Sequence, residues 1–156
     1  MDYDGRAAFE RPLEDFSPGQ RFIHWPGRTI TQAASDAFCY WTYNRQPLHL
    51  DEEYAKTTLY GQIMVNGLLI LSTAVGMSIA GVTGSIIANL GYDAVVHHAP
   101  VFIGDTIYAS STVQDVRSSA SNPKRGIVTL ETQVANQRDE VVLTFTRRFM
   151  APRKSS

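Results

Sequence analysis

Residues 65–91 read VNGLLILSTAVGMSIAGVTGSIIANLG, and no charged side chain occurs from Thr57 to Tyr92. An apolar run of this length raises the question of a membrane-spanning helix. However, glycine, serine, threonine and asparagine interrupt the run, and it lacks basic flanks. A helix that is apolar on nearly every side is also typical of a protein core. We therefore expect a buried central helix from about Asn66 to Ala80, ended by Gly81 and Gly84, and no membrane partner.

Four segments after this helix have the composition of β-strands. They are rich in Val, Ile, Thr and Tyr and span residues 85–97, 105–117, 126–135 and 140–150. Apolar and polar residues alternate clearly in IYASSTV (107–113) and VTLETQV (128–134). Helices thus precede a run of strands without βαβ units, which predicts an α+β fold. We expect one antiparallel sheet wrapped around the long central helix, because a sheet of this size needs a cover for its apolar face.

Shorter elements are expected before the central helix. Arg21 to Trp25 alternates as a short strand does, and Pro26-Gly27 is predicted to turn it. Thr29 and Gln32 have the spacing of a capping box, which predicts a helix from there to Trp41. On that helix three apolar side chains share one face: Ala34, Phe38 and Trp41.

The ends of the chain are predicted to lie outside the domain. Residues 1–20 are polar and acidic and are expected to form a loose leader. The expected domain covers residues 21–151, and residues 152–156 form a tail. Within the domain, Pro47 places a turn before His49, and Asp51 is the natural N-cap of a short helix over EEYAKT.

Composition limits the class of protein. The chain has 156 residues, of which 44% are hydrophobic and 19% charged, so it can form one packed domain. A formal net charge of −1 gives no electrostatic reason to expect nucleic acid as a partner. The single cysteine, Cys39, cannot form an intramolecular disulfide, which fits a reducing compartment and a cytoplasmic location. Its expected role is that of a small core residue.

Asn66 and Gly67 are the first candidates for chemistry. An asparagine N-cap leaves the first amides of a helix without internal partners, and a glycine beside it lets a ligand approach them. Such amides would suit a carbonyl oxygen that becomes an enolate during a reaction. The alternative interpretation is an ordinary N-cap followed by a glycine needed for close packing.

Histidines are the other candidates. His49 lies on a turn and could act as a base on water, or it could be a structural histidine. His97 and His98 are adjacent on a predicted strand, so they are expected to point to opposite faces and not to share one site. A metal site is not expected, because the chain has one cysteine and no histidine spacing typical of ligands on one helical face.

The segment from Tyr43 to His49, YNRQPLH, resembles the motif of the MaoC-like dehydratases, a family that includes the (R)-specific enoyl-CoA hydratases. The family motif runs Gly-Asp-x-Asn-Pro-Leu-His and is followed by an acidic residue, Ala-Lys, an aromatic-glycine pair and a Gly-Leu that opens the central helix. The matching residues follow here in order: Asp51, Ala55-Lys56, Tyr60-Gly61, Gly67-Leu68 and, at a later strand start, Gly104-Asp105-Thr106-Ile107. The resemblance covers most of the chain beyond the leader.

This resemblance implies a hot-dog fold, usually a homodimer, and a reversible addition of water to an enoyl thioester carried by CoA or an acyl carrier protein. It implies no cofactor. His49 matches the catalytic histidine, and Gly67 matches the glycine whose amide binds the thioester oxygen. Asn66 is expected beside the substrate, as is Gln46, which stands where the family has asparagine.

Asn44 departs from the family pattern, because it occupies the position of the catalytic aspartate. An amide can orient water but cannot exchange protons as a carboxylate does. The sequence around it resembles that of relatives acting on branched dicarboxyl-CoA substrates such as mesaconyl-CoA, and Arg45 could then hold a second carboxylate. A hydratase or dehydratase is the leading interpretation, and a non-catalytic thioester-binding protein and a hot-dog thioesterase are the alternatives.

Overall fold

A computed structural model of the chain describes residues 4–154. In chain order its elements are the short helical turns Gly5–Ala8 (η1) and Leu13–Asp15 (η2), strand β1 (Arg21–Thr29), helix α1 (Gln32–Trp41), the turn Pro47–His49 (η3), helices α2 (Glu52–Thr57) and α3 (Gly67–Met77), the wide turn Ile79–Thr83 (η4), and strands β2 (Ala88–His97), β3 (Thr106–Ser118), β4 (Arg125–Asn136) and β5 (Val141–Pro152).

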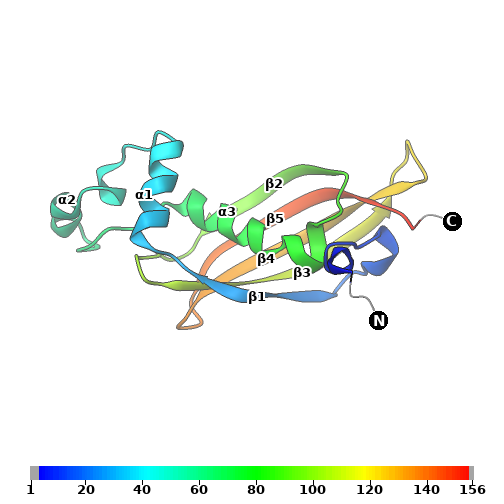
Figure 1. Ribbon diagram of the computed structural model, residues 1–156, viewed down its shortest axis with the longest axis horizontal. Helices are drawn as coiled ribbons and strands as arrows, with labels where there is room; N and C mark the ends of the chain where they lie inside the picture. The colour runs from blue at the N-terminus through cyan, green and yellow to red at the C-terminus, as the bar shows by residue number, and fades with distance from the viewer. Residues whose placement is uncertain (1–3, 155–156) are drawn as a thin grey trace.

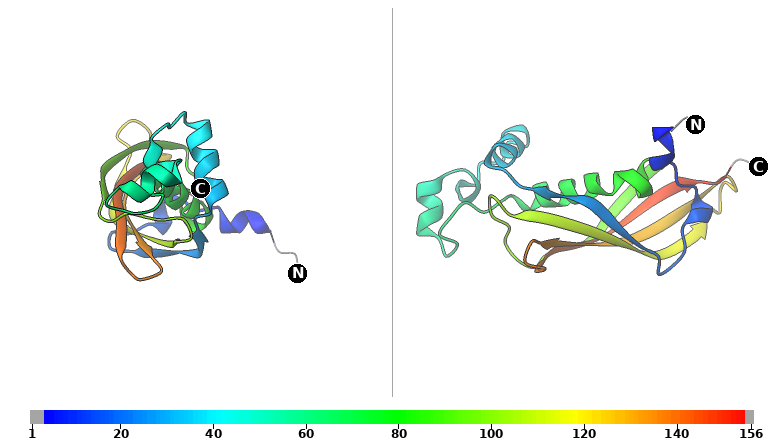
Figure 2. Two further views of the ribbon diagram at one scale, coloured as in Figure 1. Left: turned by 90° about the vertical axis from the view of Figure 1, so that its left-hand side faces the viewer. Right: turned by 60° about the horizontal axis from the view of Figure 1, so that its bottom comes forward.

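The five strands form one antiparallel sheet in the order β1-β3-β4-β5-β2. Helix α3 lies along the inner face of this sheet, which curves around it, while α1 and α2 extend beyond one end and the two termini lie at the other (Figures 1 and 2). The predicted α+β hot-dog arrangement, with a sheet wrapped around a central helix, is therefore confirmed.

Helix α3 begins where the sequence predicts. The side chain of Asn66 caps it by accepting the amide hydrogen of Leu68 at 2.9 Å. The helix ends at Met77, three residues before the predicted end, because Ala80 and Gly81 leave helical geometry and Gly81 has a φ of 77°. The prediction that this helix is buried on nearly every side is wrong for the single chain. Ile70 and Ala74 are buried, but Leu68 is 56% exposed.

The core of the domain consists of two apolar clusters, the first of which includes residues of α3. One gathers around Ile70, Ile107 and Phe145, and the other around Leu130 and Phe149. Buried polar side chains lie between them on the inner face of the sheet. His24 Nε2 and Ser111 Oγ are 2.8 Å apart, and Ser111 Oγ and Thr132 Oγ1 are also 2.8 Å apart, so three neighbouring strands share one hydrogen-bonded row.

A buried arginine, Arg147 of β5, joins the sheet to the end of the helix region. Its guanidinium donates to Asn89 Oδ1 at 2.6 Å, to Ser78 Oγ at 3.2 Å and to Thr83 Oγ1 at 3.3 Å. Burial lowers the pKa of this guanidinium. These bonds satisfy polar groups that would otherwise be costly inside the core.

The prediction of a loose leader is wrong for the residues described. Leu13 and Phe16 are buried in the second cluster. Arg11 lies over the rings of Phe16 and Phe22, at 5.7 Å and 4.9 Å from their centroids. The segment therefore closes one end of the core. At the other terminus β5 continues to Pro152, one residue into the predicted tail.

Two local predictions before α3 also need correction. Pro26-Gly27 does not end the strand, because β1 continues to Thr29 with a shift in register between His24 and Arg28. Thr29 therefore pairs with β3, its hydroxyl 2.7 Å from that of Thr106, and Thr31 caps α1 instead by accepting the Ala34 amide hydrogen.

Helix α1 turns a different face inward from the one predicted. It buries Ser35 and Cys39, whereas Trp41 is 77% exposed. Cys39 is thus a core residue, as expected. No helix formed by residues 4–154 is long and apolar enough to cross a membrane.

Burial of His24 predicts a specific loss of stability in acid. Burial lowers the pKa of His24 below the ordinary value of 6.5, so below that pH the unfolded chain binds a proton that the folded chain does not. The free energy of unfolding should therefore fall as the pH drops from about 7 to about 5. His24→Gln, which cannot take up this proton, should show a smaller fall. Urea unfolding at both pH values measures the difference, and equal falls in the two proteins would contradict this assignment.

Candidate active site

A cavity of about 450 Å³ opens beside the first residues of α3. It is lined by His49, Tyr60, Met64, Val65, Asn66, Gly67, Leu68, Ile70, His97, His98, Ala99, Pro100, Val101 and Val142. The lining therefore combines apolar side chains from the core with a few polar groups, which is the usual character of a small-molecule site. Three of the predicted site residues meet here: His49, Asn66 and Gly67.

His49 is held in one orientation. It ends the turn η3, where it is 8% exposed, and its Nδ1 lies 2.6 Å from the carbonyl oxygen of Met64. A carbonyl only accepts, so Nδ1 carries the hydrogen and donates it. In the neutral ring Nε2 is then the unprotonated nitrogen. A ring fixed in this tautomer can accept a proton at Nε2.

Gly67 offers an unoccupied amide hydrogen at the start of α3. The next three amides are engaged by Asn66: its side chain accepts from Leu68, and its carbonyl accepts from Leu69 and Ile70 at 3.0 Å and 3.4 Å. Among residues 4–154 no acceptor takes the Gly67 amide hydrogen. This donor sits at the positive end of the helix dipole and on the wall of the cavity, which suits an anionic or polarised oxygen.

His97 packs directly against Gly67. A Cβ atom placed on Gly67 would lie 2.4 Å from Cε1 of His97 and 2.9 Å from each of its ring nitrogens. Glycine is therefore required at this position for His97 to occupy its place. The prediction that His97 and His98 cannot share a site is wrong, since both line the cavity at the end of β2, where the strand geometry stops.

The remaining predicted residues lie elsewhere. Asn44 and Arg45 line a second cavity of about 530 Å³, next to exposed Tyr40, Trp41 and Tyr43. Asn44 Oδ1 accepts the amide hydrogen of Gln46 at 2.9 Å, which closes the turn leading to η3, and Gln46 itself is exposed. None of Asn44, Arg45 and Gln46 is among the residues that line the cavity with His49.

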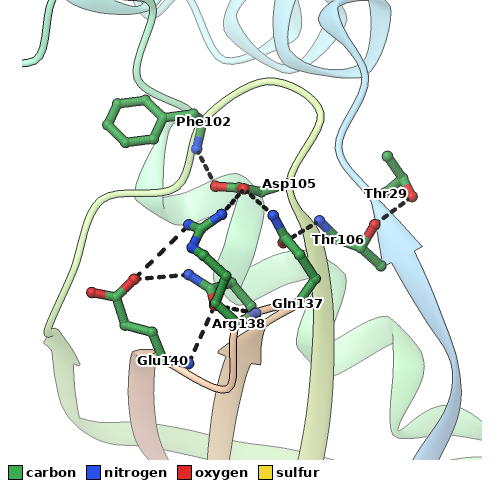
Figure 3. A network of polar contacts seen from close by, with 8 residues as sticks. Thr29, Phe102, Asp105, Thr106, Gln137, Arg138 and Glu140 are labelled. Atoms are coloured by element: carbon green, nitrogen blue, oxygen red, sulfur yellow. Dashed lines mark hydrogen bonds and ion pairs between the residues drawn. The ribbon is translucent and has the colours of Figure 1, made fainter.

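A network of polar contacts holds the loop that forms one wall of the site (Figure 3). The buried carboxylate of Asp105 accepts from the Phe102 amide at 2.9 Å, from Gln137 Nε2 at 2.6 Å and from Arg138 Nη1 at 3.1 Å. Burial alone would raise the pKa of Asp105, but these hydrogen bonds and the Arg138 charge outweigh it and lower the pKa. The loop from His98 to Asp105 is fixed in place as a result.

Backbone contacts connect this loop to the start of α3. Val65 N donates to Val101 O at 2.8 Å, and Met64 pairs with Phe102 in an isolated bridge. The ring of Tyr60 packs on that of Phe102, with centroids 6.4 Å apart. The described part of the chain contains no group of three or more His, Cys, Asp or Glu side chains placed to hold a metal ion.

Comparison with known proteins gives one family for this arrangement. The family model described as MaoC like domain matches residues 15–136. A mesaconyl-CoA hydratase from Haloarcula marismortui is 29% identical over 143 residues, which is 91% of this chain but 40% of that protein. This chain therefore spans less than half the length of that relative.

Solved structures agree in fold. The MaoC-like dehydratase from Rhodospirillum rubrum is 30% identical, with a TM-score of 0.83, and the match covers 94% of this chain and all of that one. A Mycobacterium tuberculosis protein described as having a double hot-dog fold matches with a TM-score of 0.86 and 27% identity, over 94% of this chain and 45% of its own.

Proposed function

Because the chain belongs to the MaoC-like dehydratase family, we propose that it adds water reversibly across the double bond of an enoyl thioester. The observation that carries this proposal is that His49 and the free Gly67 amide line one cavity, from opposite ends of the segment between η3 and α3. His49 supplies a base and the Gly67 amide an oxyanion donor, and hydration of an enoyl thioester uses both groups.

The proposed chemistry follows from these positions. The thioester oxygen accepts the Gly67 amide hydrogen, and His49 Nε2 takes a proton from a water molecule as that water attacks the β-carbon. The π electrons of the double bond move toward the thioester oxygen, giving an enolate that the amide and the helix dipole stabilise. Protonation of the α-carbon completes the addition, and no cofactor is required.

In this proposal Asn44 has a positioning role. Its side chain lies outside the His49 cavity and bonds to the backbone of Gln46. It thus supports the turn that carries His49 rather than exchanging protons. No Asp or Glu among residues 4–154 lines the His49 cavity, which disfavours a thioesterase that uses a carboxylate against the thioester carbon.

Replacing His49 tests the proposal. We expect wild-type protein to consume the enoyl absorbance of crotonyl-CoA or mesaconyl-CoA. His49→Asn can still donate to the Met64 carbonyl but has no base, so its kcat should fall by about 10²–10⁴-fold. Circular dichroism and the Kd for a saturated acyl-CoA should stay near wild type.

The other outcomes of this assay separate the alternatives. Unchanged turnover in His49→Asn would sink the assignment of the base. Binding by the wild type without any turnover would identify a thioester-binding protein, and release of free CoA thiol would identify a thioesterase.

A dicarboxyl-CoA such as mesaconyl-CoA is the proposed substrate class. Arg45 is exposed and has no hydrogen bond or ion pair with another residue in the range 4–154. A free guanidinium near the turn that carries His49 can bind a substrate carboxylate through paired hydrogen bonds. The similarity to a mesaconyl-CoA hydratase supports this choice.

Substituting Arg45 tests the substrate class. Arg45→Gln should raise KM for mesaconyl-CoA by about tenfold or more, the value of one charge-assisted contact, and should leave KM for crotonyl-CoA near wild type. Arg117→Gln, an exposed arginine on β3, is the matched control. Equal effects of Arg45→Gln on the KM values of both substrates would contradict the proposal that Arg45 binds a substrate carboxylate.

We also propose a homodimer formed through β2. This strand is at the edge of the sheet, and its apolar residues Leu90, Tyr92, Val95 and Val96 are 38–45% exposed. An exposed apolar edge is a template for pairing with another strand. Pairing of β2 with its copy would extend the sheet and also cover the exposed side of α3 around Leu68.

A charge on β2 tests this interface. Val96→Asp should convert the dimer to monomer in sedimentation equilibrium, because it places like charges next to each other and desolvates them. Ile23→Asp, at a 68% exposed position on the opposite edge strand β1, should remain a dimer. The reverse pattern would assign the interface to β1.

A further inference from the structure

We propose that His97 is the second acid–base group of the site and delivers the proton to the α-carbon of the substrate. This inference rests on the proposed hydration reaction, which needs an acid as well as a base. The family position that would supply a carboxylate holds Asn44, and that residue lies on another cavity. The side chains that line the His49 cavity are therefore the candidates for this acid.

Four of those lining side chains carry an exchangeable proton: His49, Tyr60, His97 and His98. His49 is bound to the Met64 carbonyl and is already assigned as the base. His98 Nε2 lies 2.8 Å from Thr144 Oγ1, so that nitrogen is engaged. Tyr60 packs on Phe102, and a phenol is intrinsically a weaker acid than an imidazolium. His97 is the best remaining donor.

The position of His97 fits this role. It is exposed at the end of β2, and neither ring nitrogen has a hydrogen-bond or ion-pair partner within residues 4–154. Its ring covers the face of Gly67 where a side chain would begin, so it lies next to the amide proposed to bind the thioester oxygen. The α-carbon is one bond from the thioester carbonyl carbon. A proton donor beside that oxygen is therefore also beside the α-carbon.

The step balances in protons and electrons. Water forms the new carbon–oxygen bond at the β-carbon and loses one proton to His49 Nε2. The enolate then collapses, and its electron pair forms a bond with the proton released by the His97 imidazolium. The substrate gains one water molecule, His49 ends protonated and His97 ends neutral. Solvent at the open mouth of the cavity resets both rings, and in dehydration His97 removes the α-proton.

Two variants and a chemical rescue test this assignment. His97→Gln should keep the fold, because no side-chain hydrogen bond or ion pair among residues 4–154 depends on its ring, and should bind acyl-CoA with a Kd near wild type. Its kcat should fall by about 10²-fold or more with KM little changed. His97→Gly leaves an open space at the cavity, and added imidazole should restore a large part of its kcat. The same imidazole concentrations should leave wild-type turnover unchanged.

Each result decides a separate point. Normal kcat in both variants, with an active wild type, would overturn the role of His97 and leave the hydratase proposal standing. A loss of kcat that imidazole does not restore, together with weaker acyl-CoA binding, would also overturn it and make His97 a packing residue. A wild type inactive on crotonyl-CoA and mesaconyl-CoA would overturn the hydratase proposal, and this assignment would fail with it.

Discussion

The path of the backbone from Met64 to Gly67 is the constraint on which the site depends. The Met64 carbonyl fixes the tautomer of His49, and the Val65 amide ties the segment to Val101. Asn66 then caps α3 and occupies three of its first amides, which leaves the Gly67 amide free. Consecutive residues thus orient the proposed base, anchor the wall of the cavity and supply the proposed oxyanion donor. Their spacing follows from local helix geometry, because the first amides of a helix have no acceptor in a preceding turn of that helix.

The rest of the fold keeps this segment in place. The apolar cluster around Ile70 and Phe145 holds α3 against the sheet, and the second cluster packs the N-terminal segment and Val82 against it. Buried polar side chains, including His24 and Arg147, lie between the clusters. Such hydrogen-bonded groups are costly when left unpaired, so they favour one register of the strands. The N-terminal segment closes the far end of the core through Leu13 and Phe16. The end with the cavity is left open, walled by a loop that Asp105 fixes (Figure 3).

Local patterns in the sequence predict most of the fold. The Asn66 cap, the α3 start and the four late strands follow from capping chemistry and period-two alternation, and the structure confirms them. The errors involve contacts between distant segments. Thr29 has good capping spacing, but pairing with Thr106 draws it into β1. The inner face of α1 depends on what packs against it, so spacing alone could not exclude Trp41.

The same limit applies to the site. Local motif spacing is sufficient to single out His49 and Gly67, which meet in one cavity. His97 could not be found in this way, because its contact with Gly67 joins the end of β2 to the start of α3 across 30 positions of the chain. Gly67 is the one sequence signal for this contact, because a residue without a side chain next to an N-cap leaves room for another group to pack there. Asn44 is the opposite case, because it occupies a position of the family motif but its side chain lines a different cavity.

A structure of the protein with a bound 3-hydroxyacyl-CoA tests the central claim most directly. The account predicts the thioester oxygen within hydrogen-bonding distance of the Gly67 amide nitrogen, about 2.9 Å. It also predicts the β-hydroxyl next to His49 Nε2. An acyl group bound outside this cavity, with its thioester oxygen away from the Gly67 amide and its β-hydroxyl away from His49, would contradict it.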